Sequence, residues 1–408
     1  MSRYAPVPAP RAEGPLPSPW THVARVAAAL AAGMGVGRFV YTPILPLMHA
    51  QAGLSTDAGA HLATANYVGY LLGALAGTLF PALVRSRTVL RGSFVLLIGT
   101  LAAMPVTDST TAWIALRLLA GMASALVFVV AVSSLLGHLR NHPAHMPGWG
   151  FGGVGAGIAL SGLLVLALRS VADWQVAWWS SAALATALAA AAWNLRPEAP
   201  AAPSIDAPEK VVGPWFGALF VSYALEGVGY IVAGTFLVAA IGQSSPGWIG
   251  SGAWVLVGLA AVPSSALWAR LGRRWSRPGL LCVALVIQAV GIALPALAGG
   301  VAAALVGAVL FGATFIGVST LALATGAELQ FPRSVALLTA GYSIGQILGP
   351  LAVAPLLHHG YRPALLLAAA VVLAAAVAAA VLRTGFPPRQ TVALRPSAAA
   401  RDVRTAGR

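Results

Sequence analysis

Long apolar runs alternate with short polar segments along almost the whole chain. A helix of about 20 apolar residues crosses the roughly 30 Å hydrocarbon core of a bilayer, so each run predicts one transmembrane helix. Twelve runs fit, at 22–48, 60–84, 88–107, 111–136, 149–170, 174–195, 213–241, 248–269, 278–298, 300–326, 335–357 and 363–383. The pattern therefore predicts an all-α integral membrane protein with twelve transmembrane helices.

The segment RPEAPAAPSIDAPEK, between the sixth and seventh runs, is the most polar and proline-rich stretch of the interior and marks a linker. An offset of 192 residues superposes glycines in equivalent runs, namely 35 and 37 on 227 and 229, and 153 and 157 on 345 and 349. Shared glycines at one offset predict two parallel, pseudo-symmetric six-helix halves. The expected segments are a disordered cytoplasmic tail (1–21), an N-terminal six-helix half (22–195), a cytoplasmic linker (196–212), a C-terminal six-helix half (213–383) and a basic cytoplasmic tail (384–408).

The composition supports a membrane protein, because 59% of the residues are hydrophobic and only 8% are charged, whereas soluble proteins carry roughly 25% charged residues. The formal charge of +14 suggests nucleic acid at first sight. With a cytoplasmic N-terminus, however, all but four of the 24 Lys and Arg residues fall in tails or loops on the cytoplasmic side. We therefore expect both termini in the cytoplasm and anionic membrane lipid, not nucleic acid, as the partner of the arginines. The single Cys282 excludes an intramolecular disulfide.

Four motifs carry a family resemblance: GVGRFVYTPILPLM from residue 35, ATANYVGYLLGALAG from 63, YALEGVGYIVAGTFL from 223 and GYSIGQILGP from 341. They resemble bacterial transporters of the YbfB/YjiJ type, a branch of the major facilitator superfamily. The resemblance implies a major facilitator fold, a carrier role, a monomer and a place in the bacterial inner membrane. LRLLAG, from residue 116, resembles the arginine-glycine motif of the superfamily, but the loop at 77–87 lacks the usual aspartate.

Arg38 is the most informative residue of the first run, because an arginine at membrane depth costs at least about 2.5 kcal/mol unless it has a polar environment. Tyr41 and Thr42 follow at helical spacing and are expected to share its face. We expect Pro43 and Pro46 to loosen the backbone hydrogen bonds beyond the arginine. The alternatives for Arg38 are contact with an anionic substrate, an ion pair with Glu226, and a side chain that extends to the headgroups.

Glu226 is the one acidic residue well inside a predicted helix. A medium of low dielectric favours the neutral form of a carboxyl group and a nearby arginine favours the charged form, so Glu226 is a candidate proton carrier. A permanent pair with Arg38, a substrate contact and a carboxyl group satisfied by the helix backbone are the alternatives.

Other polar or aromatic stripes are candidate contributors to a central site, because a polar side chain gains nothing by facing acyl chains. Arg117 either faces the interior or extends to the headgroups. Tyr67 is expected to point away from the stripe that its neighbours form. The remaining candidates for substrate binding or coupling are Asn66, Tyr70, Tyr230, Tyr342 and Gln346.

The leading function is a secondary transporter that moves a small solute by alternating access, with a solute or proton gradient as the energy source. Uptake of an organic anion and export of an amphipathic compound both remain open, as does proton coupling. A non-transporting membrane sensor with a carrier-like fold is the alternative. The sequence has no Walker-type run and no recognisable catalytic or metal-binding set, so we expect neither an enzyme nor a cofactor or metal.

Overall fold

The protein is represented by a computed structural model, which describes residues 18–139, 142, 146–197, 213–245, 248–329, 331 and 334–384. Most of the predicted linker and nearly all of both predicted tails lie outside these residues. Within the described ranges the regular structure is entirely helical. The elements are α1 (Pro19–Leu30), η1 (Ala31–Val36), α2 (Tyr41–Gln51), α3 (Thr56–Leu79), α4 (Pro81–Val84), α5 (Arg87–Ala103), η2 (Met104–Val106), α6 (Thr110–His138), α7 (Met146–Leu168), α8 (Trp174–Ala192), α9 (Gly213–Ser244), α10 (Trp248–Leu271), α11 (Arg277–Leu297), α12 (Gly300–Glu328), α13 (Ser334–Leu357) and α14 (Tyr361–Arg383).

Eleven of the described helical segments are long and apolar enough to cross a membrane, and α1, η1 and α2 together form the first of them. Each coincides with one of the twelve predicted runs. The remaining run, 174–195, forms α8, a helix of 19 residues that is not among the eleven. Tryptophan, glutamine and serine residues at its start lower its hydropathy, so the count of twelve transmembrane helices stays a prediction.

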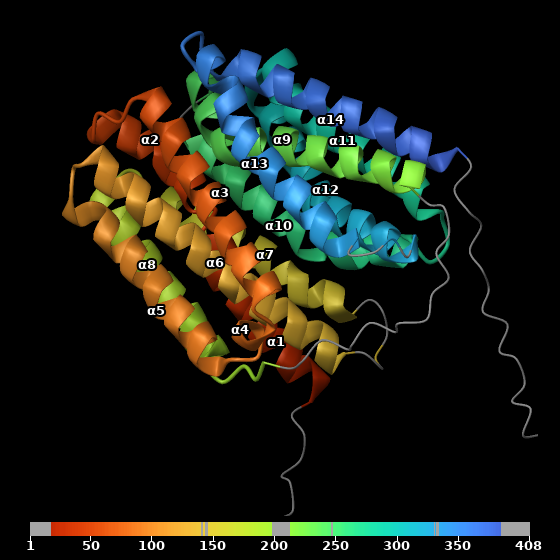
Figure 1. Ribbon diagram of the computed structural model, residues 1–408. Coiled ribbons are helices and arrows are strands. Elements are labelled where there is room, and N and C mark those ends of the chain that lie inside the picture. Colours follow the sequence, from red (N-terminus) through yellow and green to blue (C-terminus); the bar gives the residue numbers. More distant parts are fainter. Residues whose placement is uncertain are drawn as a thin grey trace, which may run out of the picture.

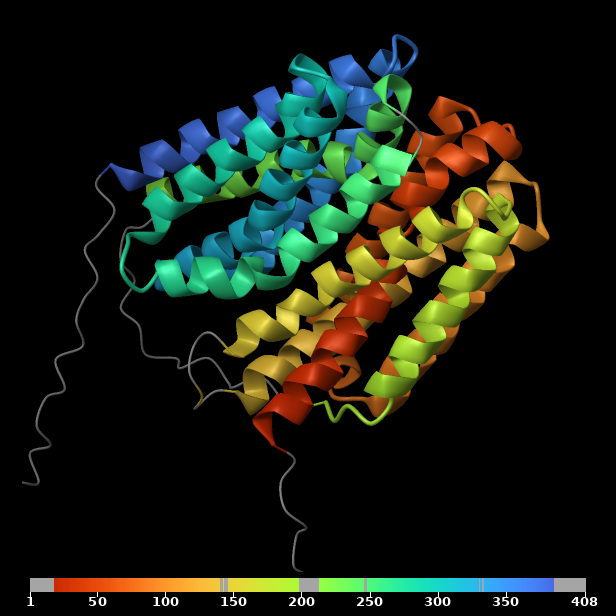
Figure 2. The same ribbon diagram turned by 180° about the vertical axis from the view of Figure 1, so that it is seen from behind.

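The helices form two bundles that lie side by side (Figures 1 and 2), one built from α1–α8 and the other from α9–α14. They meet where α7 packs on α10, α3 on α13 and α2 on α9. We call the end of the molecule where α2 ends the His49 end, and the opposite end, where α5 begins, the Arg85 end. Any site between the bundles is therefore framed by α2, α3, α7, α9, α10 and α13.

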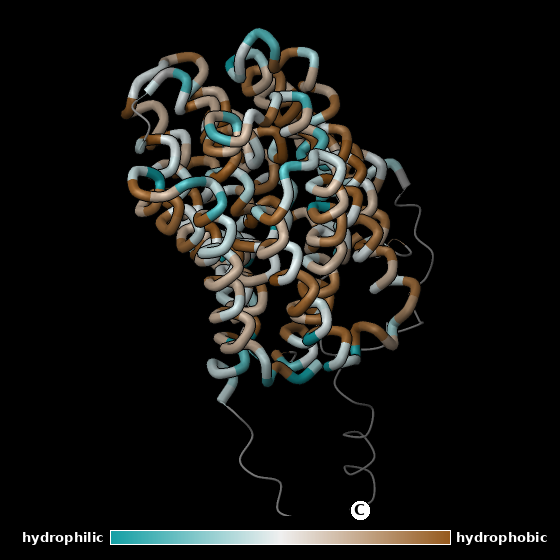
Figure 3. Tube along the Cα trace, turned by 90° about the vertical axis from the view of Figure 1, so that its left-hand side faces the viewer, coloured by the Kyte–Doolittle hydropathy of each residue, from teal (hydrophilic) through white to brown (hydrophobic). Residues whose placement is uncertain are grey.

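Hydrophobic residues line the shafts of the helices, and many strongly hydrophilic residues lie at the turns (Figure 3). Large apolar side chains also point outwards, such as Val95 and Val377, which are 62% and 65% exposed. An apolar outer surface of this extent is suited to contact with acyl chains.

The glycines that the sequence offset related make equivalent close contacts in the two bundles. A Cβ at Gly153 or Gly157 would lie within 2.5 Å of a backbone oxygen of α1 or η1. A Cβ at Gly345 or Gly349 would lie within 2.7 Å of a backbone oxygen of α9. Small residues permit this backbone approach between membrane helices.

The first span is interrupted at residues 31–40, which we call the helix break. η1 is a π-helical turn in which the amide of Gly37 donates to the oxygen of Ala32 at 2.9 Å and that of Phe39 to Met34 at 3.2 Å. Pro43, in the first turn of α2, has no amide proton to give to Phe39, so one further backbone hydrogen bond is missing next to the break. The interruption lies before and around Arg38, whereas the sequence predicted it only beyond the arginine. The break places Arg38 on a turn between two helical segments.

Candidate functional site

Arg38 lies at the meeting of the two bundles and is 3% exposed. Its guanidinium carbon lies 4.2 Å from the ring centre of Tyr70, 4.9 Å from that of Tyr67 and 5.4 Å from that of Phe39. Its Nη2 donates a hydrogen bond to Oε1 of Gln346 on α13. The Nε proton has no acceptor. The cation is thus held by aromatic faces and a neutral amide.

Tyr67 was expected to point away from this site, and that prediction was wrong. Its ring contacts Arg38, and its hydroxyl lies 2.7 Å from Oγ1 of Thr235 on α9. Tyr67 and Tyr70 lie three residues apart on α3 and therefore share a face. This spacing was a usable signal that both rings could contact the same side chain.

Tyr41 and Thr42 each have a hydrogen-bond partner of their own. The Tyr41 hydroxyl donates to the oxygen of Gly59 at 2.8 Å, and the Tyr41 ring centre lies 5.0 Å from the guanidinium carbon of Arg117. The Thr42 hydroxyl donates to the oxygen of Gly234 in the other bundle. That the two residues share the face of Arg38 stays a prediction.

Arg117, on α6, donates hydrogen bonds to the backbone of the helix break. It is 2% exposed, and it donates to the oxygens of Gly37 at 3.3 Å and Arg38 at 3.1 Å. These are backbone groups that an uninterrupted helix would satisfy internally. Of the two alternatives for Arg117, the structure therefore favours the interior position over extension to the headgroups. Asn66 in turn donates to the oxygen of Arg117 at 2.9 Å, so both residues position the arginine of the break.

Glu226 on α9 is fully buried and pairs with the second bundle alone. Its Oε1 accepts a hydrogen bond from Nε2 of Gln288 on α11 at 3.2 Å, and its Oε2 has no donor. Neither Glu226 nor Arg38 has a salt bridge in the described part of the chain, so the predicted pair between them is absent from this arrangement. Gln288 was missed, although a lone glutamine within the apolar run 278–298 was a usable signal.

Four rings form a continuous aromatic stack in the second bundle. Tyr342 stacks on Tyr223 at 4.3 Å and on Tyr230 at 5.3 Å, and Tyr230 stacks on Phe315 at 5.1 Å between ring centres. Phe39 of the helix break meets Phe315 edge-on at 5.6 Å. The stack therefore begins beside Arg38, and Tyr342 lies one helical turn from Gln346 on α13.

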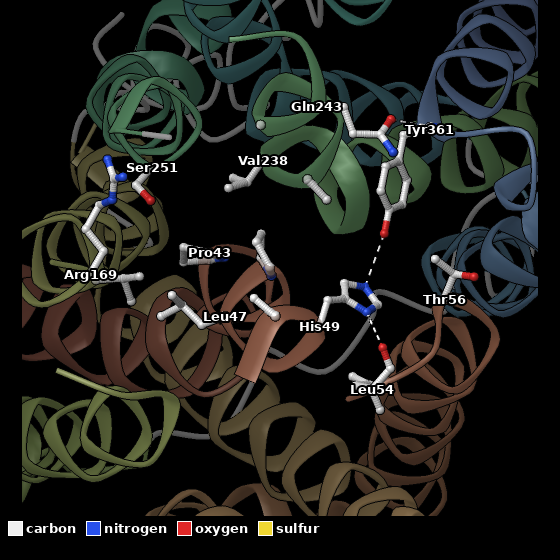
Figure 4. A pocket seen from close by; sticks show the side chains of 15 residues that line it. Pro43, Leu47, His49, Leu54, Thr56, Arg169, Val238, Gln243, Ser251 and Tyr361 are labelled. Atoms are coloured by element: carbon white, nitrogen blue, oxygen red, sulfur yellow. Dashed lines mark hydrogen bonds between the residues drawn. The ribbon is translucent and has the colours of Figure 1, made fainter. Parts of the chain in front are cut away.

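Further polar contacts join the bundles at the His49 end. His49 lies 3.1 Å from the hydroxyl of Tyr361, and its other ring nitrogen contacts the oxygen of Leu54 (Figure 4). His358 and Asp57 form an exposed ion pair at 3.5 Å. A cavity of about 610 Å³ opens at this end, with Arg169 and Ser251 on the side away from His49 (Figure 4).

No group of three potential metal ligands among His, Cys, Asp and Glu occurs within the described residues. The central residues named above instead offer two guanidinium groups, one carboxyl group, three amides and a row of rings. Such a set can bind and orient an organic solute, and these residues include no pair of nucleophile and base for covalent chemistry.

A solved structure and a protein-family profile both match this chain. The chain matches the crystal structure of a mutant of the nucleoside transporter NupG with a TM-score of 0.66, over 89% of this chain and 99% of that one. The two share 13% sequence identity, a level at which the likeness shows the fold alone. A search of curated proteins gives no match. The sequence profile of the family described as "Uncharacterised MFS-type transporter YbfB" matches residues 30–380. The chain therefore belongs to this family of MFS-type transporters and is a multi-pass membrane protein.

Proposed function

We propose that the protein is a secondary active transporter that moves a small solute by alternating access between two pseudo-symmetric six-helix halves. The observation that carries the proposal is Arg38. It is a buried cation without a carboxylate partner among the described residues, it lies on an interrupted helix, and it lies where the bundles meet. Interrupted membrane helices commonly form the binding sites of carriers, because their free backbone groups and side chains face a cavity.

Pseudo-symmetry of the halves is supported by two pairs of residues at the 192-residue offset. Thr42 donates to the oxygen of Gly234, its own counterpart at that offset. Gln51 accepts from the amide at the start of α8 at 2.7 Å, and Gln243 accepts from the amide at the start of α14 at 3.1 Å. Equivalent residues with equivalent partners favour a repeated six-helix unit, with α8 as its sixth helix.

The direction of opening is supported by the polar contacts between the bundles. Those contributed by Arg38, Thr42, Tyr67, His49 and His358 run from the centre to the His49 end. We infer that these contacts close the central site towards the His49 end and that the cavity at that end lies outside them. Alternating access requires a second arrangement in which these contacts separate and the Arg85 end closes.

Proton coupling through Glu226 fits its surroundings. An ionised carboxylate with one free oxygen and no cation is costly to bury, so we infer that Glu226 carries a proton in this arrangement. Opening of the site to water on one side would hydrate the carboxylate and release the proton. The sign of the coupling, symport or efflux, depends on which arrangement binds the solute.

We place the protein as a monomer in a bacterial inner membrane with both termini in the cytoplasm. Arg85, Arg87 and Arg91 lie at the Arg85 end, where the positive-inside rule puts the cytoplasm and anionic lipid. The His49 end then faces outwards.

Paired spin labels test alternating access without knowledge of the solute. On a background with Cys282→Ser, one pair (Ala50→Cys with His359→Cys) spans the His49 end and another (Arg85→Cys with Arg274→Cys) spans the Arg85 end; all four positions are exposed. We expect acidification to change the two distances in opposite directions. Distances that stay fixed, or change in the same direction, would contradict the proposal and favour a sensor with a rigid carrier-like fold.

The same labels test the role of Glu226. In a Glu226→Gln background, which mimics the neutral acid, both distance distributions should become independent of pH. An unchanged response to pH in this variant would remove Glu226 from the coupling mechanism. Asp108→Asn, an exposed acid between η2 and α6 that forms none of the contacts named between the bundles, is the matched control and should leave the response in place.

A further inference from the structure

We infer that the central site takes an aromatic carboxylate, and that the substrate carboxylate replaces Gln346 as the acceptor for Arg38. This inference rests on the proposed transport function and names the class of solute that the same site would bind.

The charge of the site favours an anion. Arg38 and Arg117 are both buried near the helix break, and neither contacts a carboxylate in the described part of the chain. Arg117 is already occupied by two backbone oxygens. Arg38 has one neutral acceptor and a free Nε proton. A buried guanidinium in this state has donors left for a bidentate anion, which is the partner that its planar fork fits best.

Gln346 occupies the position that such an anion would take. Its amide oxygen accepts the Nη2 proton of Arg38 across the interface between the bundles. A carboxylate is the stronger acceptor for the guanidinium, because it carries a full negative charge and its two oxygens can accept two parallel N–H bonds. The substrate would displace Gln346 and break one contact that links the bundles, which couples binding to their movement.

The aromatic part of the inference comes from the stack beside Arg38. Tyr67 and Tyr70 flank the guanidinium, and Tyr342 of the aromatic stack lies four residues before Gln346, or about 6 Å along the helix. Tyr342 is half-buried, so part of its ring is available for contact. An aryl group joined directly to a carboxylate spans about this distance, and ring contacts favour it over an aliphatic acid.

An organic cation is disfavoured, although Glu226 is nearby in the fold. One oxygen of its carboxyl group is engaged by Gln288 on α11, within the second bundle. A cationic solute that approached Gln346 would meet the positive charge of Arg38 first. The positions of Arg38 and Glu226 therefore favour an anion over a cation beside Gln346.

Benzoate is the probe, with benzyl alcohol, benzylamine and acetate as matched neutral, cationic and aliphatic compounds. Binding is measured by calorimetry on purified wild type, Arg38→Gln, Gln346→Glu and Gln346→Leu. We expect wild type to bind benzoate in preference to the other three. The Gln346→Glu variant places a permanent carboxylate on Arg38 and should weaken benzoate binding by about tenfold or more, whereas Gln346→Leu should retain it.

The two substitutions at Gln346 keep the test valid if Arg38→Gln fails to fold. Thermal unfolding verifies folding, and we expect Gln346→Glu to unfold at a higher temperature than Gln346→Leu. The inference is overturned if benzylamine binds and benzoate does not, if no probe binds wild type, or if Gln346→Glu and Gln346→Leu bind benzoate equally. In each of these cases the spin-label distances decide separately whether alternating access holds.

Discussion

A methyl group added at Gly35 should push the helix break away from α7. Gly35 lies against Gly157, and a Cβ built on Gly35 would lie 2.4 Å from the Cα of Gly157 and 2.7 Å from the oxygen of Val154. All the nearest atoms belong to the backbone of α7, so no side chain is available to rotate away. To reach an ordinary contact of 3.4 Å, the two segments must separate by about 1 Å.

Two opposing effects set the magnitude. Alanine gains up to about 1 kcal/mol over glycine in a helix through its lower conformational entropy when unfolded. Overpacking of a tight contact costs about 1 to 3 kcal/mol, and here the rigid backbone on both sides favours the upper part of that range. The clash therefore outweighs the gain, and the Gly35→Ala variant should lose about 1 to 2 kcal/mol of unfolding free energy.

Gly99→Ala on α5 is the matched control, because a Cβ there meets nothing within 4 Å. Only the gain in helix propensity applies, so this variant should be as stable as wild type or more stable by up to about 1 kcal/mol. Reversible unfolding of the purified protein in mixed micelles measures both. If the Gly35→Ala variant is as stable as the Gly99→Ala variant, the close contact does not exist and the packing argument is refuted.

Three further predictions follow from individual hydrogen bonds. Arg117→Met should speed amide exchange in the helix break, because two carbonyl oxygens lose their donor. The control is Arg91→Met, which removes an arginine that also donates to a carbonyl oxygen but lies outside the break; it should leave this exchange unchanged. Equal exchange in both variants would contradict the supporting role of Arg117. Gln51→Leu and Gln243→Leu should each lower the free energy of unfolding by about 0.5 to 1.5 kcal/mol, since each removes the acceptor for one amide at the start of α8 or α14. A loss in only one of the two variants would argue against equivalent helix starts in the two halves. Trp113→Phe should cost a similar amount, about 1 kcal/mol, through its lost bond to a backbone oxygen, and unchanged stability would show that this bond contributes nothing.

The linear sequence was sufficient for the membrane class and for the position of the helices. Hydropathy over about 20 residues reports a property of each segment alone, because every helix must satisfy its own backbone hydrogen bonds and face lipid wherever neighbours leave it uncovered. Eleven of the twelve predicted runs coincide with membrane-length helices for this reason. The run 174–195 became a helix as well, but its polar start kept its hydropathy low.

Which side chains meet was decided by the tertiary structure. Arg38 was recognised from its cost in a bilayer, yet its partners Tyr67 and Gln346 depend on the π-helical turn before it and on the contact between bundles. Helical spacing predicts neighbours along one helix only, so it could not indicate that Tyr41 and Thr42 donate to backbone oxygens of α3 and α9. The sequence by itself determined that an arginine and a glutamate lie at membrane depth. The packing of α3, α11 and α13 decided that they do not pair, because Arg38 bonds to the neutral Gln346 across the interface and Glu226 accepts from the neutral Gln288 within the second bundle.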